Sequence, residues 1–389
     1  MKILLIRPRL IGDVVFTTPV VRAVRRRFPD AWISYLVEPE AAPVVQANPN
    51  LNEIIVAPRR GGWYQVADDL VLARRLRARR FDLVIDLHGG PRSSWFAWAT
   101  RAPRRIGYDV FGRRWMYTTS VHRPRQLRPR HSVQNQWDLL APLGIDPPDP
   151  QCDGTEMAED AAAARAVHAR LANAGISPTH QIVVIHVSAG NPFRRWPAVA
   201  FIELAVGLVK NDPVRRIAVT SGPSDAAARR DIIEAARRRL AQPDAILDCA
   251  EFSLAELRAL LARAALYIGG DSGPLHIAST TPVPIVGIYG PTLPVRSQPW
   301  RDPTLISEAV EFGVLPCRPC EQRHCVPGDY RCLTGIEPAT VLAAAERALE
   351  RQHALTMYVS TGRPTTEATE EAASTSVTRG HRVSDLNSL

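Results

Sequence analysis

Short, largely apolar runs alternate along the chain with longer stretches in which apolar residues recur at helical spacing. In the first 150 residues the runs predict buried parallel strands at 3–6, 32–37, 53–57 and 81–87. The longer stretches predict helices at 13–27, 64–80 and 131–143. Strands that alternate with helices in this way are typical of a doubly wound parallel sheet.

Pro147, Pro148 and Pro150 interrupt this pattern and predict a linker, after which the alternation begins again with a helix at 158–174. Further strands are expected at 182–187, 217–220, 245–248, 266–269 and 284–289, and further helices at 198–210, 224–240 and 253–264. Ser253 and Glu256 form a capping box at the start of the last helix. The chain therefore resolves into two α/β halves of similar size with a cleft between them.

The end of the chain has a different composition. Beyond about residue 356 it is rich in Thr, Ser, Glu and Gly and has few apolar residues. Such a segment cannot bury enough apolar surface to fold, so we expect the tail 356–389 to be disordered.

Positive charge is concentrated in the first half. The 389 residues include 48 Lys and Arg against 39 Asp and Glu, a net charge of +9. Residues 1–150 hold 24 of the basic and 13 of the acidic residues, a net +11. Such a field attracts phosphates, nucleic acid or an acidic membrane surface, and the alternative is a solvated basic face without a partner. No helix-turn-helix, zinc-finger or RNP-like pattern is found, so a nucleic-acid partner is not expected.

The apolar runs also bear on where the protein works. None of them approaches the length of a membrane-spanning helix, and the first run is too short for the core of a signal peptide. We therefore expect a cytoplasmic protein. Six cysteines in a cytoplasmic chain of this size argue against a disulfide scaffold.

The turn after the first predicted strand is the first candidate site. It contains neither of the familiar glycine-rich phosphate loops and reads Arg9-Leu-Ile-Gly-Asp13, followed by Thr17-Thr18-Pro19. Ligands of open α/β sheets bind outside the carboxyl ends of the strands, which is where this turn lies. Asp13 is therefore expected to face the cleft. The alternative is that Asp13 is a helix N-cap, a position that Asp favours.

Two loops in the second half have features of phosphate sites. Ser188, Arg194 and Arg195 follow a predicted strand, and a helix begins near Pro197, so the loop could hold a phosphate through charge and backbone N–H groups. An ordinary loop with exposed arginines is the alternative. The segment from Gly269 to His276 also follows a strand, and its glycines permit close backbone approach to an anion. A plain turn is a weaker explanation for so many special residues.

Several segments together resemble glycosyltransferase family 9, the heptosyltransferases of lipopolysaccharide core assembly. They are Leu-Ile-Gly-Asp-Val-Val at 10–15 with Thr-Thr-Pro, Phe-Asp-Leu-Val-Ile-Asp-Leu-His-Gly at 81–89, Arg-Ile-Gly-Tyr at 105–108, Arg-Arg-Trp-Pro at 194–197, Gly-Asp-Ser-Gly-Pro-Leu-His at 270–276 and Tyr-Gly-Pro-Thr at 289–292. They occur in the family's order over nearly all of the folded chain.

The resemblance implies a GT-B fold, in which two Rossmann-like domains face a cleft. Residues 1–160 would bind the acceptor, and residues 176–353 the nucleotide sugar, with a Cys-rich loop at 316–333. The implied reaction transfers a heptose from ADP-heptose to a sugar hydroxyl, inverts the anomeric centre and needs no metal or other cofactor. The implied partners are this donor and an anionic glycolipid at the inner face of the cytoplasmic membrane, which the enzyme would contact peripherally.

The resemblance also implies roles for single residues. Asp13 matches the general base, which would take the proton of the acceptor hydroxyl. The candidate donor-binding residues are Ser188, Arg194, Arg195, Asp225, Asp271, Ser272, Gly273 and His276. The candidate acceptor contacts are Gly12, Arg59, Arg60, Arg92, Arg104 and Arg105. Arg194 stands where the family often has Lys, which keeps the charge but changes the geometry.

Four cysteines, Cys317, Cys320, Cys325 and Cys332, lie close together in the sequence. They could hold a structural zinc ion, remain as reduced thiols or form a local disulfide.

Two other functions are open at this point. One is the same fold acting on a UDP- or GDP-linked sugar for a different glycoconjugate. The other is a protein that binds a nucleotide sugar without catalysis.

Overall fold

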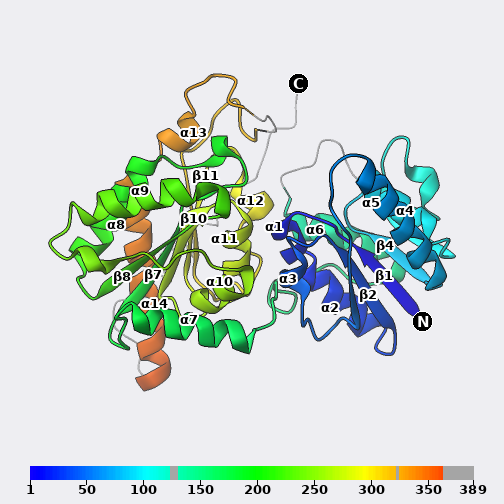
Figure 1. Ribbon diagram of the computed structural model, residues 1–389, viewed down its shortest axis with the longest axis horizontal. Helices are drawn as coiled ribbons and strands as arrows, with labels where there is room; N and C mark the ends of the chain where they lie inside the picture. The colour runs from blue at the N-terminus through cyan, green and yellow to red at the C-terminus, as the bar shows by residue number, and fades with distance from the viewer. Residues whose placement is uncertain (123–129, 321–323, 362–389) are drawn as a thin grey trace, which may run out of the picture.

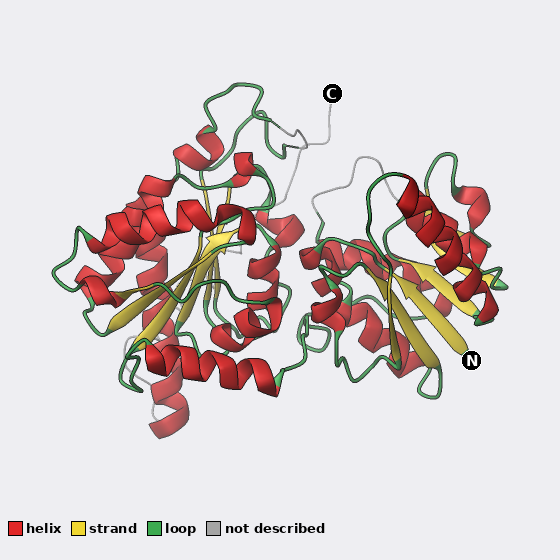
Figure 2. Ribbon diagram, in the orientation of Figure 1, coloured by secondary structure: helices red, strands yellow, loops and turns green. Residues whose placement is uncertain are grey.

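The computed structural model describes residues 1–122, 130–320 and 324–361 and contains two parallel β-sheets, each covered by helices on both faces (Figures 1 and 2). The first sheet has the order β3-β2-β1-β4-β5-β6. Its strands are β1 (Lys2–Ile6), β2 (Trp32–Val37), β3 (Glu53–Val56), β4 (Leu83–Asp86), β5 (Arg104–Asp109) and β6 (Thr119–His122). The order reverses between β1 and β4, which places the loops after these strands at a switch point.

The second sheet has the same kind of order, β12-β11-β10-β7-β8-β9. Its strands are β7 (Gln181–His186), β8 (Arg215–Thr220), β9 (Ile246–Leu247), β10 (Leu266–Gly270), β11 (Ile285–Tyr289) and β12 (Ser307–Glu311). The central strands are buried on both faces, which explains why they read as continuous apolar runs. The switch point here lies between β7 and β10.

The helices pack their apolar stripes on these sheets. In the first half they are α1 (Ile11–Val15), α2 (Thr18–Arg27), α3 (Ala42–Val45), α4 (Trp63–Ala78), α5 (Pro91–Ala99) and α6 (Ser132–Trp137), with short 3₁₀ helices η1 (Arg114–Met116) and η2 (Asp138–Leu143). In the second half they are α7 (Ala161–Asn173), α8 (Ala198–Asn211), α9 (Ala226–Arg237), α10 (Leu254–Leu261), α11 (Gly273–Ala278), α12 (Pro294–Ser297), α13 (Arg331–Thr334) and α14 (Pro338–Thr361), with short 3₁₀ helices at 192–194, 223–225 and 243–245. None of the helices in the described ranges is long and apolar enough to cross a bilayer.

Three features differ from the sequence-based expectations. The helix expected at 13–27 is two helices, because the chain turns at Phe16 and Thr17, whose hydroxyl donates to the carbonyl of Val14. Residues 356–361, which were expected to be part of a disordered tail, belong to α14, which continues to Thr361. The rest of the expected tail, 362–389, lies outside the described part. Several strands and α-helices were not predicted from the pattern at all, namely β5, β6, β12, α3, α5, α12, α13 and α14.

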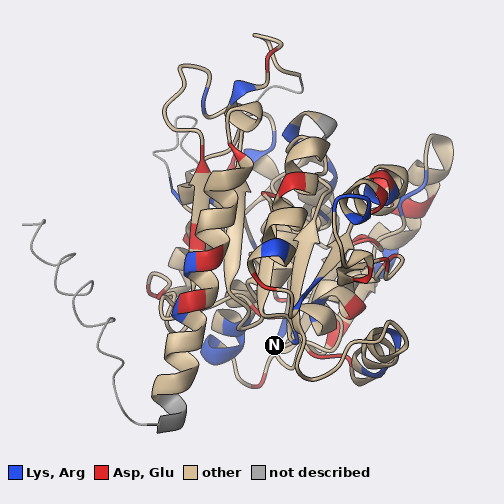
Figure 3. Ribbon diagram, turned by 90° about the vertical axis from the view of Figure 1, so that its left-hand side faces the viewer, with Lys and Arg blue, Asp and Glu red and all other residues tan. Residues whose placement is uncertain are grey.

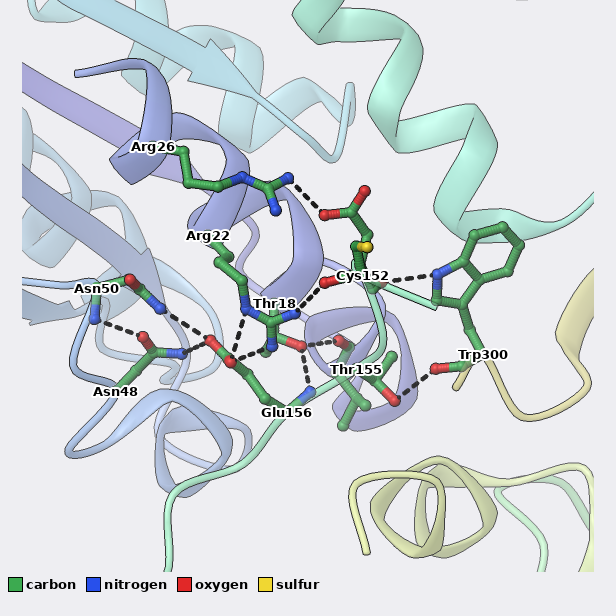
Figure 4. A network of polar contacts seen from close by, with 11 residues as sticks. Thr18, Arg22, Arg26, Asn48, Asn50, Cys152, Thr155, Glu156 and Trp300 are labelled. Carbon is green, nitrogen blue, oxygen red and sulfur yellow. Dashed lines mark hydrogen bonds and ion pairs between the residues drawn. The ribbon is translucent and has the colours of Figure 1, made fainter. Parts of the chain in front are cut away.

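The linker between the two halves is held by polar contacts to both (Figure 4). On the first half, the carboxylate of Glu156 accepts from Arg22 and from the amides of Asn48 and Asn50, at 3.0 and 3.1 Å for the amides. On the second half, the hydroxyl of Thr155 donates to the carbonyl of Trp300 at 2.9 Å. The linker is therefore anchored on both sides rather than free to swing.

The two halves also share apolar packing. Val14 of α1 and the following residue of the turn, Phe16, belong to the same buried cluster as Leu275 and Ile277 of α11, and the two helices are in contact. This contact places the end of β1 in the first half directly against the loop after β10 in the second. The candidate residues of both halves can therefore act on one site.

Candidate active site

Asp13 lies on the first turn of α1, just after the carboxyl end of β1. Its Oδ2 forms an ion pair with the guanidinium of Arg7 at 2.6 Å. Arg7 is almost fully buried and also donates to the carbonyl of Leu87 at 2.7 Å. Burial tends to lower the pKa of Arg7, but the attraction of Asp13 and neighbouring groups outweighs it and raises the pKa.

The two oxygens of Asp13 are not equivalent. Oδ2 contacts Arg7 and, more weakly, the backbone N–H of Leu10 at 3.5 Å, whereas Oδ1 makes no hydrogen bond to any residue in the described ranges. About a third of the side chain is exposed to solvent. The ion pair thus fixes the orientation of the carboxylate and leaves one oxygen able to accept a proton.

Glycines allow α1 and α11 to touch. A Cβ on Gly12 would lie 2.3 Å from Cδ2 of His276, and a Cβ on Gly273 would lie 3.0 Å from the side chain of Ile11. Any larger residue at position 12 would therefore separate Asp13 from the loop after β10. The structure thus shows a steric role for Gly12 at the domain contact, and its predicted contact with the acceptor stays a prediction.

The loop after β10 is built around a buried carboxylate. Asp271 lies 3.4 Å from Nε2 of His276. Burial alone would raise the pKa of Asp271, but His276 and the hydroxyls of Thr292 and Ser297 lower it below its ordinary value. The hydroxyl of Ser272 is buried and has no hydrogen-bond partner among the described residues. Such a group suits contact with a bound ligand.

The loop after β7 brings the remaining donor candidates together. Arg195 forms an ion pair with the buried carboxylate of Asp225 at 2.6 Å. Arg194 has no acidic partner in the described part of the chain; its guanidinium lies 5.7 Å from the ring centroid of Phe193. Asp225, a candidate donor-binding residue, neutralises Arg195 in the structure. Arg194 is the freer cation of the two.

The other polar side chains of this region support the loops. The hydroxyl of Ser188 accepts from the backbone N–H of Gly222 at 2.9 Å. His186 is buried, with its Nδ1 3.0 Å from the hydroxyl of Thr220. Burial lowers the pKa of His186 to about 4. This imidazole therefore remains neutral near pH 7 and holds β7 and β8 in place.

Three of the predicted acceptor residues lie at the carboxyl edge of the first sheet. Glu38, after β2, pairs with Arg92 at 2.7 Å and with Arg59 at 3.4 Å. Arg92 also pairs with Asp69 and donates to the carbonyl of Pro58, so its nitrogens are fully engaged. Arg59 has one long contact and is about half exposed, which makes it the better candidate for binding an anion.

Arg60 is the third of these residues. It is 65% exposed and pairs with Asp68 at 3.3 Å. Exposed pairs at this distance are weak, so Arg60 could exchange this partner for a phosphate.

Arg104 and Arg105 are the remaining predicted acceptor contacts, and that role stays a prediction. They begin β5 and pair in register with Leu83 and Val84, at the amino end of the sheet. Asp109, at the carboxyl end of β5, is five residues from Arg104 and four from Arg105, or about 13–17 Å at the usual strand rise. Arg105 instead donates to the carbonyl of Met116 at 2.9 Å and fixes the turn that follows β5.

Sequence reasoning missed two supporting residues besides Arg7 and Glu38. Asp86 is fully buried at the end of β4 and accepts hydrogen bonds from the backbone of His88 and Gly89 and from Ser93 and Tyr117. Burial raises its pKa above the ordinary value. Asp86 shapes the turn that leads into α5. A carboxylate inside an apolar strand was the signal that could have revealed it.

The second missed residue is His131, at the start of α6. Its Nδ1 accepts from the backbone N–H of Val133 at 3.1 Å, and its Nε2 donates to the carbonyl of Gln298 in the second half at 2.9 Å. Burial lowers its pKa to about 4. This neutral imidazole is a polar link between the two halves.

The four clustered cysteines line a cavity of about 660 Å³ beside Phe193. All six cysteines are free thiols, so the local disulfide is not formed. Burial raises the pKa of Cys332. In the described ranges no three His, Cys, Asp or Glu side chains are arranged to hold a metal ion. A structural zinc ion at these four cysteines stays a prediction.

Comparison with known proteins agrees with this architecture. The family model "Glycosyltransferase family 9 (heptosyltransferase)" matches residues 70–330. A lipopolysaccharide heptosyltransferase 3 of Escherichia coli is 26% identical over 348 residues, covering 88% of this chain and 97% of the relative.

Solved structures show the same fold. A family 9 glycosyltransferase of Veillonella parvula superimposes with a TM-score of 0.77 at 24% identity, covering 90% of this chain and 97% of that one. The E. coli ADP-heptose lps heptosyltransferase II gives a TM-score of 0.71 at 20% identity, covering 91% and 100%.

The two Rossmann-like domains, with α1 of one against α11 of the other, have the GT-B fold of these solved structures. The matched model covers well over half of the chain. This protein belongs to glycosyltransferase family 9.

Proposed function

We propose that the protein transfers a heptose from ADP-heptose to a sugar hydroxyl of the lipopolysaccharide core or a related phosphorylated glycolipid. The observation that carries this proposal is the contact between α1 and α11, which brings Asp13 against the loop from Asp271 to His276. A base and an anion-binding loop that meet in this way suit transfer between two bound sugars. The similarity to proteins named as heptosyltransferases supports heptose as the sugar.

The reaction we propose is a single displacement. Oδ1 of Asp13 takes the proton of the acceptor hydroxyl as that oxygen bonds to the anomeric carbon. The bond from this carbon to the diphosphate breaks on the opposite face, so the configuration inverts and ADP leaves with the electron pair. Arg7 holds the carboxylate in place through Oδ2. Holding the base in one orientation lowers the entropic cost of reaching the transition state.

The leaving ADP gathers negative charge, which protein groups must stabilise. Arg194 and Arg195 are the cations that we propose for this role, and the unpartnered hydroxyl of Ser272 is a further donor. Arg195 is less free than Arg194 because it also balances Asp225. In this proposal no metal ion takes part.

The basic first domain suits a phosphorylated acceptor. Arg59 and Arg60 lie on the loop between β3 and α4, at the same edge of the sheet as Asp13. Replacing both with Glu should raise the acceptor KM and leave ADP affinity unchanged, because neither residue lies in the donor half. Equal losses of acceptor and ADP binding would contradict this assignment.

A donor panel tests the proposed function. Acceptor-dependent release of the nucleoside diphosphate is measured with ADP-heptose and with UDP- and GDP-linked sugars, each with and without EDTA. We expect turnover with ADP-heptose alone, unchanged by EDTA. Turnover with a UDP- or GDP-linked sugar would replace the donor assignment, and tight binding without turnover for any donor would indicate a non-catalytic protein.

A further inference from the structure

The helix α4 presents apolar side chains to solvent as well as to the sheet. Leu72, Ala73 and Leu76 are buried against the first sheet. A helix on the surface of a protein in water normally carries polar residues on its other face. The outward stripe of α4 instead consists of residues at helical spacing with large exposed fractions, namely Trp63 (77%), Val66 (50%), Leu70 (45%) and Val71 (44%).

Arginines extend this stripe toward the end of the helix. Arg74 lies one turn beyond Leu70, and Arg75 and Arg77 follow it, all three exposed. None of the three has an acidic partner within the described residues. The exposed positions of α4 carry no acidic residue. Over the second domain, by contrast, acidic and basic residues are interspersed (Figure 3).

A second exposed apolar group adjoins α4 across α5. Phe111 is 90% exposed and Trp115 is 62% exposed, at the turn and η1 that follow β5. The ring of Trp115 packs against Trp98 of α5, with centroids 5.7 Å apart. Arg101 lies 4.1 Å above the ring of Trp98. The helix α5 contacts both α4 and η1 and so connects the two exposed apolar groups.

We propose that this surface, formed by the outward stripe of α4 with Arg74, Arg75 and Arg77 and by Phe111 and Trp115, docks on an anionic lipid bilayer. Apolar side chains next to unpaired arginines match the boundary between acyl chains and anionic headgroups. Trp side chains at its rim suit the interfacial layer. The inference deepens the proposed function and rests on it, since a lipid-anchored acceptor requires the enzyme to work at a membrane.

The position of the surface agrees with this role. The helix α4 begins directly after the loop that carries Arg59 and Arg60. Figure 1 shows α4 and α5 side by side at the end of the first domain that is away from the second. Docking there would bring the candidate acceptor residues close to the lipid and leave the donor domain in solution.

A second copy of the chain is a less suitable occupant. A two-fold interface sets the same patch against itself, so the arginines of α4 would face one another with no acidic residue between them. A bilayer with anionic lipids supplies the missing negative charge.

Co-sedimentation with vesicles tests the proposal, without donor or acceptor present. We expect the protein to bind vesicles of phosphatidylglycerol mixed with phosphatidylcholine, more weakly as salt rises, and not to bind vesicles of phosphatidylcholine alone. Replacing Arg74 and Arg77 with Gln should weaken binding about 25-fold, at roughly fivefold per arginine near an anionic surface. Leu70→Glu should weaken it about tenfold or more.

The control is Leu355→Glu, which changes a leucine of similar exposure (47%) on α14 of the second domain and should leave vesicle binding unchanged. Equal vesicle binding by Leu70→Glu and wild type would overturn the proposal, and so would a wild-type dimer that ignores vesicles and becomes monomeric in Leu70→Glu. Turnover on a lipid-free core acceptor should be unaffected by both leucine variants. A protein that binds vesicles but shows no turnover would refute the proposed function alone. A protein that shows turnover but does not bind vesicles would refute the docking alone.

Discussion

Gly12→Ala should impair catalysis because it inserts a methyl group into the contact between the two domains. The new Cβ would lie 2.3 Å from Cδ2 of His276, 3.1 Å from its Nε2 and 3.3 Å from its Cγ. Ordinary contact between carbons requires about 3.5 Å. The imidazole or α1 must therefore move by about 1.2 Å.

The imidazole has little room to move. His276 is buried, contacts Asp271 at 3.4 Å and packs on Phe16 with ring centroids 4.3 Å apart. Overpacking at such a site costs about 1–3 kcal/mol of folding free energy. A shift of about 1 Å between a base and a bound substrate can lower the rate about 100-fold.

The assay measures acceptor-dependent ADP release together with urea unfolding. We expect kcat/KM of Gly12→Ala to fall about 100-fold and the free energy of unfolding to fall by about 1–3 kcal/mol. Gly61→Ala is the matched control, because its Cβ would have no atom within 4 Å, and it should behave as wild type. A Gly12→Ala enzyme with wild-type kcat/KM would refute the view that this contact aligns the site.

Three further predictions concern groups around the site. The pKa of His131 is about 4 in the folded protein and about 6.5 when unfolded, so the unfolded state binds more protons between these pH values. The free energy of unfolding should therefore fall as pH drops from 6.5 to 4, by at most about 3 kcal/mol from this residue. His131→Asn, which can still cap α6, should flatten this part of the pH profile of unfolding. Glu156→Ala leaves several donors of the linker network without an acceptor and should lower stability by about 2 kcal/mol; unchanged urea unfolding would contradict the anchoring role. Arg194→Gln should raise the donor KM without loss of stability, whereas Arg195→Gln should also destabilise the fold by about 3 kcal/mol because it leaves Asp225 buried and unpaired; isothermal titration with ADP and urea unfolding separate the two effects.

The parts of the fold that the sequence predicts best are those fixed by local chemistry. The apolar runs at 3–6 and 182–187 correspond to β1 and β7, because buried central strands read as continuous apolar segments. The capping box of Ser253 and Glu256 is formed, with the two reciprocal hydrogen bonds at 2.8 and 3.2 Å. Both patterns depend only on neighbouring residues.

The features that the sequence did not predict depend on contacts between segments that lie far apart in the chain. Arg105 begins a matching segment, but no strand was predicted there, so the end of the strand on which Arg104 and Arg105 lie could not be inferred. The ion pair of Arg7 with Asp13 depends on the turn between β1 and α1, which apolar periodicity does not describe. The steric role of Gly12 could not be predicted, because it depends on His276, which faces Gly12 from the second domain. Such relations between distant segments are not encoded in local spacing.

The most direct test of the central claim is ADP release from ADP-heptose with a phosphorylated core-lipid acceptor, comparing wild type with Asp13→Asn. The amide keeps the shape of the side chain but cannot take the proton of the hydroxyl. We predict that kcat falls by about 100-fold or more while ADP binding is retained. Unchanged release in Asp13→Asn would contradict the account and return Asp13 to a purely structural role at the start of α1.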